Sequence, residues 1–133
     1  MMYRYVIEPE NNLFRKTYEG TISVEDEINL LTQVLKDPDY RKGMNAICDF
    51  SKARVDWGLG DIDHIRAYIA KIKDQVGKCK WALITTDSVS SITARIFLVL
   101  HEAFQDTITI KLFSNEIEAM AWIDSVNADN PTV

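Results

Sequence analysis

The chain has 133 residues, of which 47% are hydrophobic and 26% are charged, a composition typical of one globular domain and unlike that of a disordered segment. The net charge is −5 and the basic residues do not cluster, which argues against a nucleic-acid partner. Its uninterrupted apolar runs, such as residues 96–100, are too short to cross a membrane, so we expect no membrane span and a cytoplasmic protein.

The N-terminal region is predicted to form a β-hairpin. Two extended runs, Met2 to Ile7 and Leu13 to Tyr18, are separated by Pro9 and two asparagines, which favour a turn. Hydrophobic and polar residues alternate imperfectly in the second run, so the sequence leaves open which side of that strand is buried.

A helix is predicted directly after the hairpin. Ser23 is placed to cap it, Asp26 stands three residues later, and the acidic Glu27 lies in the positively polarised first turn. Asp37 and Pro38 should end it. Its apolar stripe has spacings of four, three and four residues and consists of Val24, Ile28, Leu31 and Leu35, widened by Leu30 and Val34.

The middle of the chain alternates between strands and helices. Residues 44–50 are almost continuously apolar, which indicates a central strand, and residues 51–60 are predicted to be a loop. A second helix should begin at Asp61 and end at Gly77. A short strand, Trp81 to Thr85, follows it.

The C-terminal part continues this alternation. A helix is expected over residues 91–104 and a strand over residues 107–113, after which Ser114 should cap a last helix. We therefore predict one α/β domain over residues 1–126, with a mixed sheet of an N-terminal antiparallel hairpin plus parallel strands, flanked by about four helices. Residues 127–133 should be a disordered tail.

Cys48 and Cys79 form no CxxC motif and lack histidines at metal-binding spacing. Two such cysteines are typical of reduced residues in the core.

Four segments together resemble the SpoIIAA-like, STAS-related proteins of bacteria. The likeness rests mainly on Gly20, Asp49, Arg95, Ala119 and Trp122. The segments are GTISVEDEINLL, DPDYRKGMNAICDFS, TARIF and NEIEAMAWI.

The resemblance implies a small regulatory or protein-interaction domain without enzymatic activity. Relatives that act as anti-anti-sigma factors are switched by phosphorylation of a serine in an Asp-Ser-Ser-Gly-like turn. Here Asp56 matches the acid of that turn, Trp57 stands where a hydroxyl would be, and Gly58 matches the glycine only if one residue is deleted. We therefore expect no such phosphoswitch. Any phosphorylation would use Ser51 or the hydroxyl cluster of residues 86–91 instead.

One group of polar residues is a candidate site for a ligand or partner. In an open parallel sheet, ligands bind at the carboxyl ends of the strands, and the residues expected there are Asp49, Ser51, Asp56, Trp57, Thr86, Asp87 and Ser88. Arg95 should reach Asp87 or a carboxylate of a partner. The same residues also have an explanation that involves no function. The polar ones would cap helices or form loop hydrogen bonds, Trp57 would cover the core edge, and Arg95 would lie on the surface.

Other chemistries have little support, and we expect no cofactor, no metal and no catalytic residues. The Gly58-Leu59-Gly60 sequence lies in a loop too long for a dinucleotide-binding turn, and Asp87 stands where a flavin phosphate would bind. His64 and His101 are far apart in sequence and neither lies in a nucleophile motif.

The helix at residues 91–104 is apolar over more than half of its circumference. This favours a homodimer with Phe97 and Leu98 in its interface. An alternative function is a carrier domain that binds a small apolar ligand or a lipid between the sheet and the helices, as the resemblance to STAS-like folds also allows.

Overall fold

The computed structural model describes residues 2–86 and 107–125. Its elements, in chain order, are β1 (Met2–Glu8), the 3-10 turn η1 (Pro9–Asn11), β2 (Leu13–Thr21), α1 (Val24–Lys36), β3 (Asn45–Arg54), α2 (Leu59–Val76), β4 (Cys79–Ile84), β5 (Ile108–Phe113) and α4 (Glu116–Asp124).

The five strands form one mixed sheet in the order β1-β2-β3-β4-β5. β1 and β2 pair antiparallel, as the predicted hairpin requires, and the pairs β2–β3, β3–β4 and β4–β5 are all parallel. The carboxyl ends of β2, β3, β4 and β5 therefore lie at the same end of the sheet. β3 is the middle strand, as its unbroken apolar run predicts.

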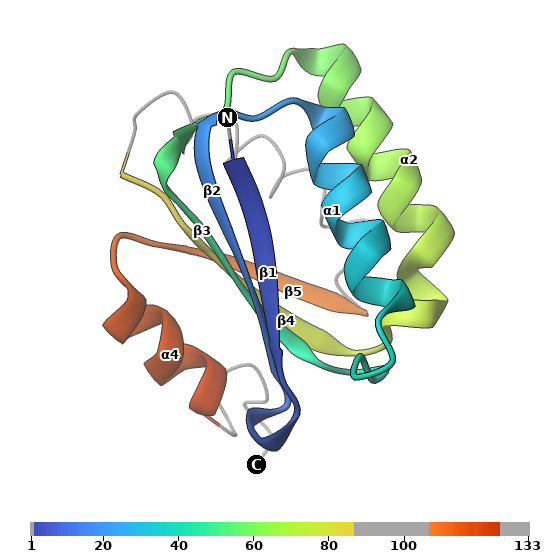
Figure 1. Cartoon of the computed structure of the whole chain (residues 1–133), viewed down its shortest axis with the longest axis vertical. Helices are drawn as coiled ribbons and strands as arrows, with labels where there is room; N and C mark the ends of the chain where they lie inside the picture. The colour runs from blue at the N-terminus through green and yellow to red at the C-terminus, as the bar shows by residue number, and fades with distance from the viewer. Residues whose placement is uncertain (1, 87–106, 126–133) are drawn as a thin grey trace.

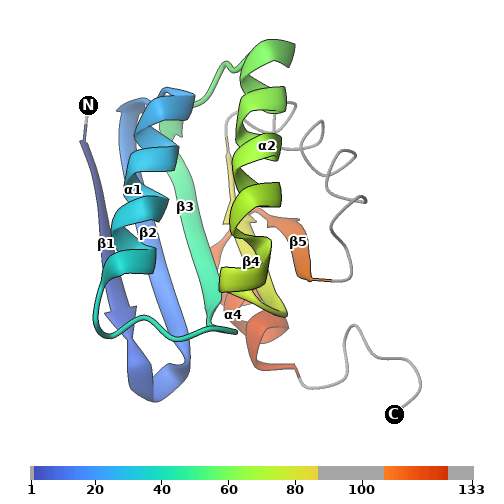
Figure 2. The ribbon, with the colours of Figure 1, turned by 90° about the vertical axis from the view of Figure 1, so that its right-hand side faces the viewer.

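Helices cover both faces of this sheet. Figure 1 shows the sheet edge-on, with α1 and α2 on one face and α4 on the other. Figure 2 shows α1 and α2 side by side on the same face, where the hydroxyls of Thr32 and Tyr68 lie 2.6 Å apart and link the two helices. The predicted α/β class with a mixed sheet is confirmed.

Apolar side chains fill the space on each side of the sheet. The larger core lies under α1 and α2 and includes Phe14, Met44, Ile69 and Trp81. A smaller core lies under α4, where Leu13, Ile47, Ala82, Ile84, Ala119, Trp122 and Ile123 pack together. Because successive residues of β2 point to opposite faces, Phe14, Lys16 and Tyr18 face α1 and α2. This decides the side of the strand that the sequence left open.

The helix ends of α1 and α2 agree largely with the predictions. Ser23 caps α1, its hydroxyl accepting from the Asp26 N–H at 3.1 Å while the Asp26 carboxylate accepts from the Ser23 N–H at 3.0 Å. Asp37 is the C-cap of α1, and Gly77, at φ 74°, is the C-cap of α2. The positive φ at Gly77 is one that glycine adopts without steric cost.

Several predicted boundaries are wrong. α2 begins at Leu59, two residues before Asp61, because the Asp61 carboxylate accepts from the Gly58 N–H at 3.1 Å and so belongs to the first turn. The N-cap of α4 is Asn115, whose side chain accepts from the Glu118 N–H at 2.9 Å, and not Ser114.

The described residues contain three α-helices rather than about four. The helix predicted at residues 91–104 and the tail at 127–133 lie outside the described residues. Within the part of the chain that is described, no helix is both long enough and apolar enough to cross a membrane.

Candidate functional site

The carboxyl end of the sheet brings together three of the residues named from the sequence. The Asp49 carboxylate accepts a hydrogen bond from the Ser51 backbone N–H at 2.9 Å, and the Thr86 hydroxyl donates to the Ser51 carbonyl at 3.2 Å. Thr86 is exposed, while Asp49 and Ser51 are partly exposed. The end of β3 and the segment after β4 are thus joined by polar contacts that solvent can reach.

A β-bulge shapes this end of the sheet. Between Thr17 and Glu19 the pairing of β2 with β3 shifts register, so Tyr18 alone lies opposite both Phe50 and Ser51. β3 therefore continues to Arg54, and the prediction of a loop from residue 51 is wrong. Sequence periodicity did not reveal this extension because the bulge interrupts the alternation of side chains.

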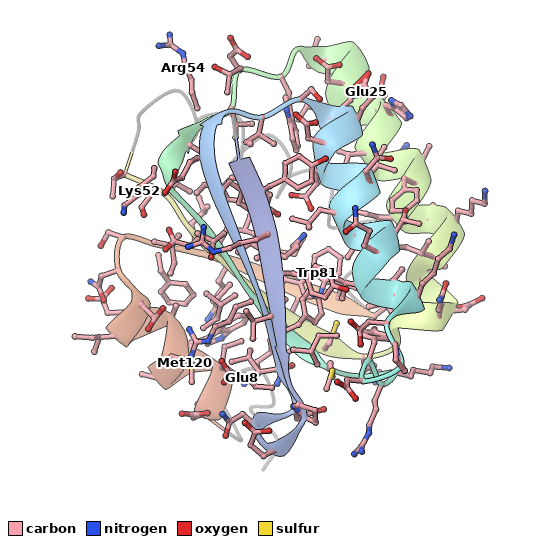
Figure 3. All side chains as sticks on the ribbon, viewed as in Figure 1. Glu8, Glu25, Lys52, Arg54, Trp81 and Met120 are labelled. Carbon is pink, nitrogen blue, oxygen red and sulfur yellow. The ribbon has the colours of Figure 1, made fainter. Side chains whose placement is uncertain are left out.

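The extension of β3 presents two cations to solvent. Lys52 and Arg54 are both exposed, and they lie opposite Glu19 and Thr21 of β2. Figure 3 shows both side chains projecting from the upper end of the sheet. Together with Thr86, they give this end of the sheet an exposed, polar and partly basic character. We name Asp49, Ser51, Lys52, Arg54 and Thr86 the strand-end surface.

Asp56 and Trp57 do not join this group. Trp57 packs against the core on the side of α1 and α2, and its indole N–H donates to the Ile22 carbonyl at 2.9 Å. Asp56 is exposed in the loop before α2. The sequence had suggested the position at the core edge for Trp57 as the alternative to a role in binding. The remaining candidates, Asp87, Ser88, Arg95, Phe97 and Leu98, lie outside the described residues.

The sequence did not reveal a group of charged and polar residues inside the larger core. The Lys16 ammonium donates to Glu27 at 2.5 Å, and the Tyr18 hydroxyl donates to the other oxygen of Glu27, also at 2.5 Å. Lys16 is 3% exposed, Glu27 6% and Tyr18 0%. We name these three residues the buried triad.

The neighbours of the buried triad explain how it fits into the core. Lys16 pairs with Cys48 of β3, and its ammonium lies 5.7 Å from the centre of the Trp81 ring on β4. The lysine side chain therefore extends across β3, where the small residues Ala46 and Cys48 face the same core. Figure 3 shows Trp81 between the sheet and α1. Tyr18 stacks on Phe50 with ring centres 4.3 Å apart and planes 4° from parallel.

The protonation of the triad follows from its surroundings. Burial lowers the pKa of Lys16, but interactions with Cys48 and Glu27 outweigh burial, so this pKa lies above its ordinary value. Burial raises the pKa of the Cys48 thiol to about 11, which keeps the thiol neutral near pH 7 and leaves Glu27 as the charge that holds the ammonium. Burial, with the Glu27 carboxylate, raises the pKa of Tyr18 well above its usual range. Lys16 is therefore a permanent cation and Tyr18 a neutral phenol, which suits a structural ion pair and not a nucleophile or a general base.

The sequence contained a signal for this triad that the prediction interpreted differently. Glu27 lies between Val24 and Leu31 on the apolar stripe of α1, yet it was assigned to the helix dipole. Because Glu27 is buried, it needs a charged partner inside the core, and that partner is Lys16. A carboxylate on the buried face of a helix needs a cation or several donors inside the core.

The cysteines and acidic residues give no further site in the described part of the chain. Cys48 and Cys79 are buried free thiols, as predicted. Among residues 2–86 and 107–125, no three His, Cys, Asp or Glu side chains gather in a way that could hold a metal ion.

Comparison with known proteins supports the fold. No family model matches the sequence, and no curated protein matches it. Among solved structures, the chain is similar to an uncharacterized protein of the DUF3478 family with a SpoIIAA-like fold from Shewanella loihica PV-4. The two chains are 16% identical, the TM-score is 0.52, and the match covers 84% of this chain and 83% of the other.

An identity this low shows the fold alone. The chain is an α/β protein with a SpoIIAA-like fold, and the resemblance seen in the sequence is confirmed at that level.

Proposed function

We propose that this chain is a non-enzymatic, cytoplasmic regulatory domain of the STAS-like kind, which acts by binding another protein through the strand-end surface. The observation that carries the proposal is the bulged end of β3, where Asp49, Ser51 and Thr86 are linked while Lys52 and Arg54 project into solvent. Bulges beside binding sites redirect side chains in this way. The SpoIIAA-like fold agrees with a regulatory role by analogy.

The buried triad favours this function over the alternative of a carrier for an apolar ligand or a lipid. Lys16 and Glu27 form an ion pair inside the core between the sheet and α1. An apolar ligand entering that space would have to lie against two charges and separate side chains that already pack together. A surface that is already exposed requires no such rearrangement.

Phosphorylation of the kind used by anti-anti-sigma relatives is not part of the proposal. Trp57 stands where that mechanism needs a hydroxyl, and its indole N–H already bonds to Ile22. Phosphopeptide mapping of the protein from its own cells should find no stoichiometric phosphate between Ser51 and Ser91. Phosphate there that alters partner binding would contradict this expectation.

Affinity capture from the native host, followed by titration of the purified partner, tests the proposal. The double variant Lys52→Glu and Arg54→Glu reverses the exposed charges and should reduce partner affinity by at least tenfold, because rim and core charges of an interface set its complementarity. Arg66→Glu with Lys71→Glu, on exposed positions of α2, is the matched control. Equal loss in both variants, or no loss in either, would refute a role for the strand-end surface.

A further inference from the structure

β1 forms one edge of the sheet. It is the first strand in the sheet order, so one of its edges pairs with β2, and no strand of the described residues pairs with the other. In Figure 1 it is the strand nearest the viewer, between the layer of α1 and α2 and the layer of α4. Its pairing with β2 runs without a register shift from Met2 to Glu8, and this stretch has no proline. Bulges and prolines are two means by which proteins protect such edges from association.

The side chains on one face of β1 form a self-complementary pattern. Tyr3, Tyr5 and Ile7 pack on the core under α1 and α2, so Arg4, Val6 and Glu8 point to the face of α4. Val6, in the middle, is 55% exposed and is one of three large apolar residues that are exposed in the described part of the chain. A cation, an exposed apolar residue and an anion thus follow one another at alternate positions.

Glu8 is held as an anion at this edge. Its carboxylate accepts from the Asn11 side chain at 2.8 Å and from the Arg15 guanidinium at 2.7 Å. These hydrogen bonds lower the pKa of Glu8 below its ordinary value. Arg4 also has an interaction within its own chain. A contact between Arg4 of one copy and Glu8 of the other would therefore add to the interactions that each residue already makes within its own chain.

Symmetry selects one register for two such strands. A twofold axis that relates antiparallel edge strands keeps the faces of both sheets aligned and makes the contact isologous. With the axis at Val6, the two Val6 residues lie opposite each other, and Arg4 of each copy lies opposite Glu8 of the other. Tyr5 of each copy then lies opposite Ile7 of the other. An axis at Arg4 or at Glu8 would instead place like charges opposite each other, which is unfavourable. An axis at Tyr5 or at Ile7 would place a charged side chain opposite Val6, so neither brings Arg4 and Glu8 together.

We propose that two copies of this chain associate antiparallel along β1, with the twofold axis at Val6, so that their two sheets become one continuous sheet. This inference does not depend on the proposed function, and it places the dimer contact at β1, whereas the sequence had suggested Phe97 and Leu98. The second copy is the occupant that this edge fits, because the order of cation, apolar residue and anion on β1 is complementary to itself when two copies of the strand run antiparallel.

Cysteine cross-linking tests the register. Val6→Cys places two thiols opposite each other at a separation that a disulfide can bridge, while Arg4→Cys alone places its thiol opposite a glutamate. Under mild oxidation, Val6→Cys should form a linked dimer at least about tenfold faster than Arg4→Cys. Mixing Arg4→Cys with Glu8→Cys should give a linked heterodimer. The native Cys48 and Cys79 are buried, and the unmutated chain under the same oxidation gives the background rate of cross-linking.

Light scattering across a range of protein concentrations tests the association itself. The unmutated chain should show a concentration-dependent dimer, and Val6→Lys should shift it to the monomer by placing two cations opposite each other. Leu59→Lys, at a residue that is 73% exposed on α2, is the matched control and should leave the dimer unchanged. A monomer at every concentration, or Val6→Cys linking no faster than Arg4→Cys, would overturn the proposal. Loss of partner binding in the variants of the strand-end surface bears on the proposed function alone.

Discussion

Removing one member of the buried ion pair should destabilise the fold strongly. In Lys16→Met, the Glu27 carboxylate stays buried, with the Tyr18 hydroxyl as its remaining hydrogen-bond donor of the triad. Breaking a buried pair in this way typically costs about 3–5 kcal/mol. Because small domains have total stabilities of about 5–15 kcal/mol, such a loss would be a large part of the total.

Protonation of Glu27 sets an upper limit to this loss. The folded variant can bind a proton at Glu27, and raising the pKa of a glutamate from about 4.3 to pH 7 corresponds to about 3.7 kcal/mol. At pH 5 the same step corresponds to only about 1 kcal/mol. A carboxylate left in a core without its cation favours the protonated form, and protonation costs more free energy at higher pH, so the penalty grows as the pH rises. Lys16→Met should therefore lose about 3–4 kcal/mol at pH 7 and about 1 kcal/mol at pH 5.

Urea unfolding followed by tryptophan fluorescence measures the loss of stability in Lys16→Met at pH 7 and at pH 5. Lys16→Met with Glu27→Gln removes the charge but keeps an acceptor for Tyr18, so it should lose about 1 kcal/mol with no dependence on pH in this range. Lys71→Met, at an exposed position of α2, should change stability by less than about 0.5 kcal/mol. A loss below about 1 kcal/mol in Lys16→Met at pH 7, or an equal loss at both pH values, would refute this reasoning.

Three further predictions concern helix α4 and the thiols. Asn115→Ala should cost about 1 kcal/mol in urea unfolding because it removes the cap of α4, whereas Ser114→Ala should be nearly neutral, and the reverse order would contradict the assigned cap. Lys80 donates to the Trp122 carbonyl at 3.0 Å and to the Ser125 carbonyl at 2.5 Å, at the C-terminal end of α4. Lys80→Met should therefore lower the free energy of unfolding by about 1–2 kcal/mol and change the near-ultraviolet circular dichroism. An unchanged spectrum would count against a role of Lys80 in holding α4. Burial raises the pKa of Cys48 to about 11 and that of Cys79 to about 12. As the pH rises, the thiols therefore lose their protons in the unfolded chain before they do so in the folded protein. The free energy of unfolding should fall above about pH 8.5, by up to about 1.4 kcal/mol per pH unit for each thiol. Cys79→Ala should make this fall shallower when unfolding is measured at pH 8 and pH 10.

Local patterns were sufficient to predict most of the elements. The cap of α1 at Ser23 and its end at Asp37 depend on residues close together in the sequence, and both agree with the structure. The same holds for Gly77, because the backbone conformation at the end of α2 is a local requirement. The apolar stripe of α1 is correct in part, because Val24 and Leu31 are buried while Ile28 and Leu35 are only partly buried. The continuous apolar run of β3 also predicted its central place in the sheet, since both faces of such a strand must be covered.

Tertiary structure decided the features on which the candidate site depends. The bulge opposite Tyr18 arises from the pairing of β2 with β3, so no alternation within either strand could reveal it. The pattern of its own strand left open whether Lys16 is buried, and Glu27 was interpreted as an acid at the start of a helix. They become an ion pair only when α1 packs on the sheet and brings their charged atoms to 2.5 Å, because the neighbours that decide whether a charge is buried come from other elements of the chain.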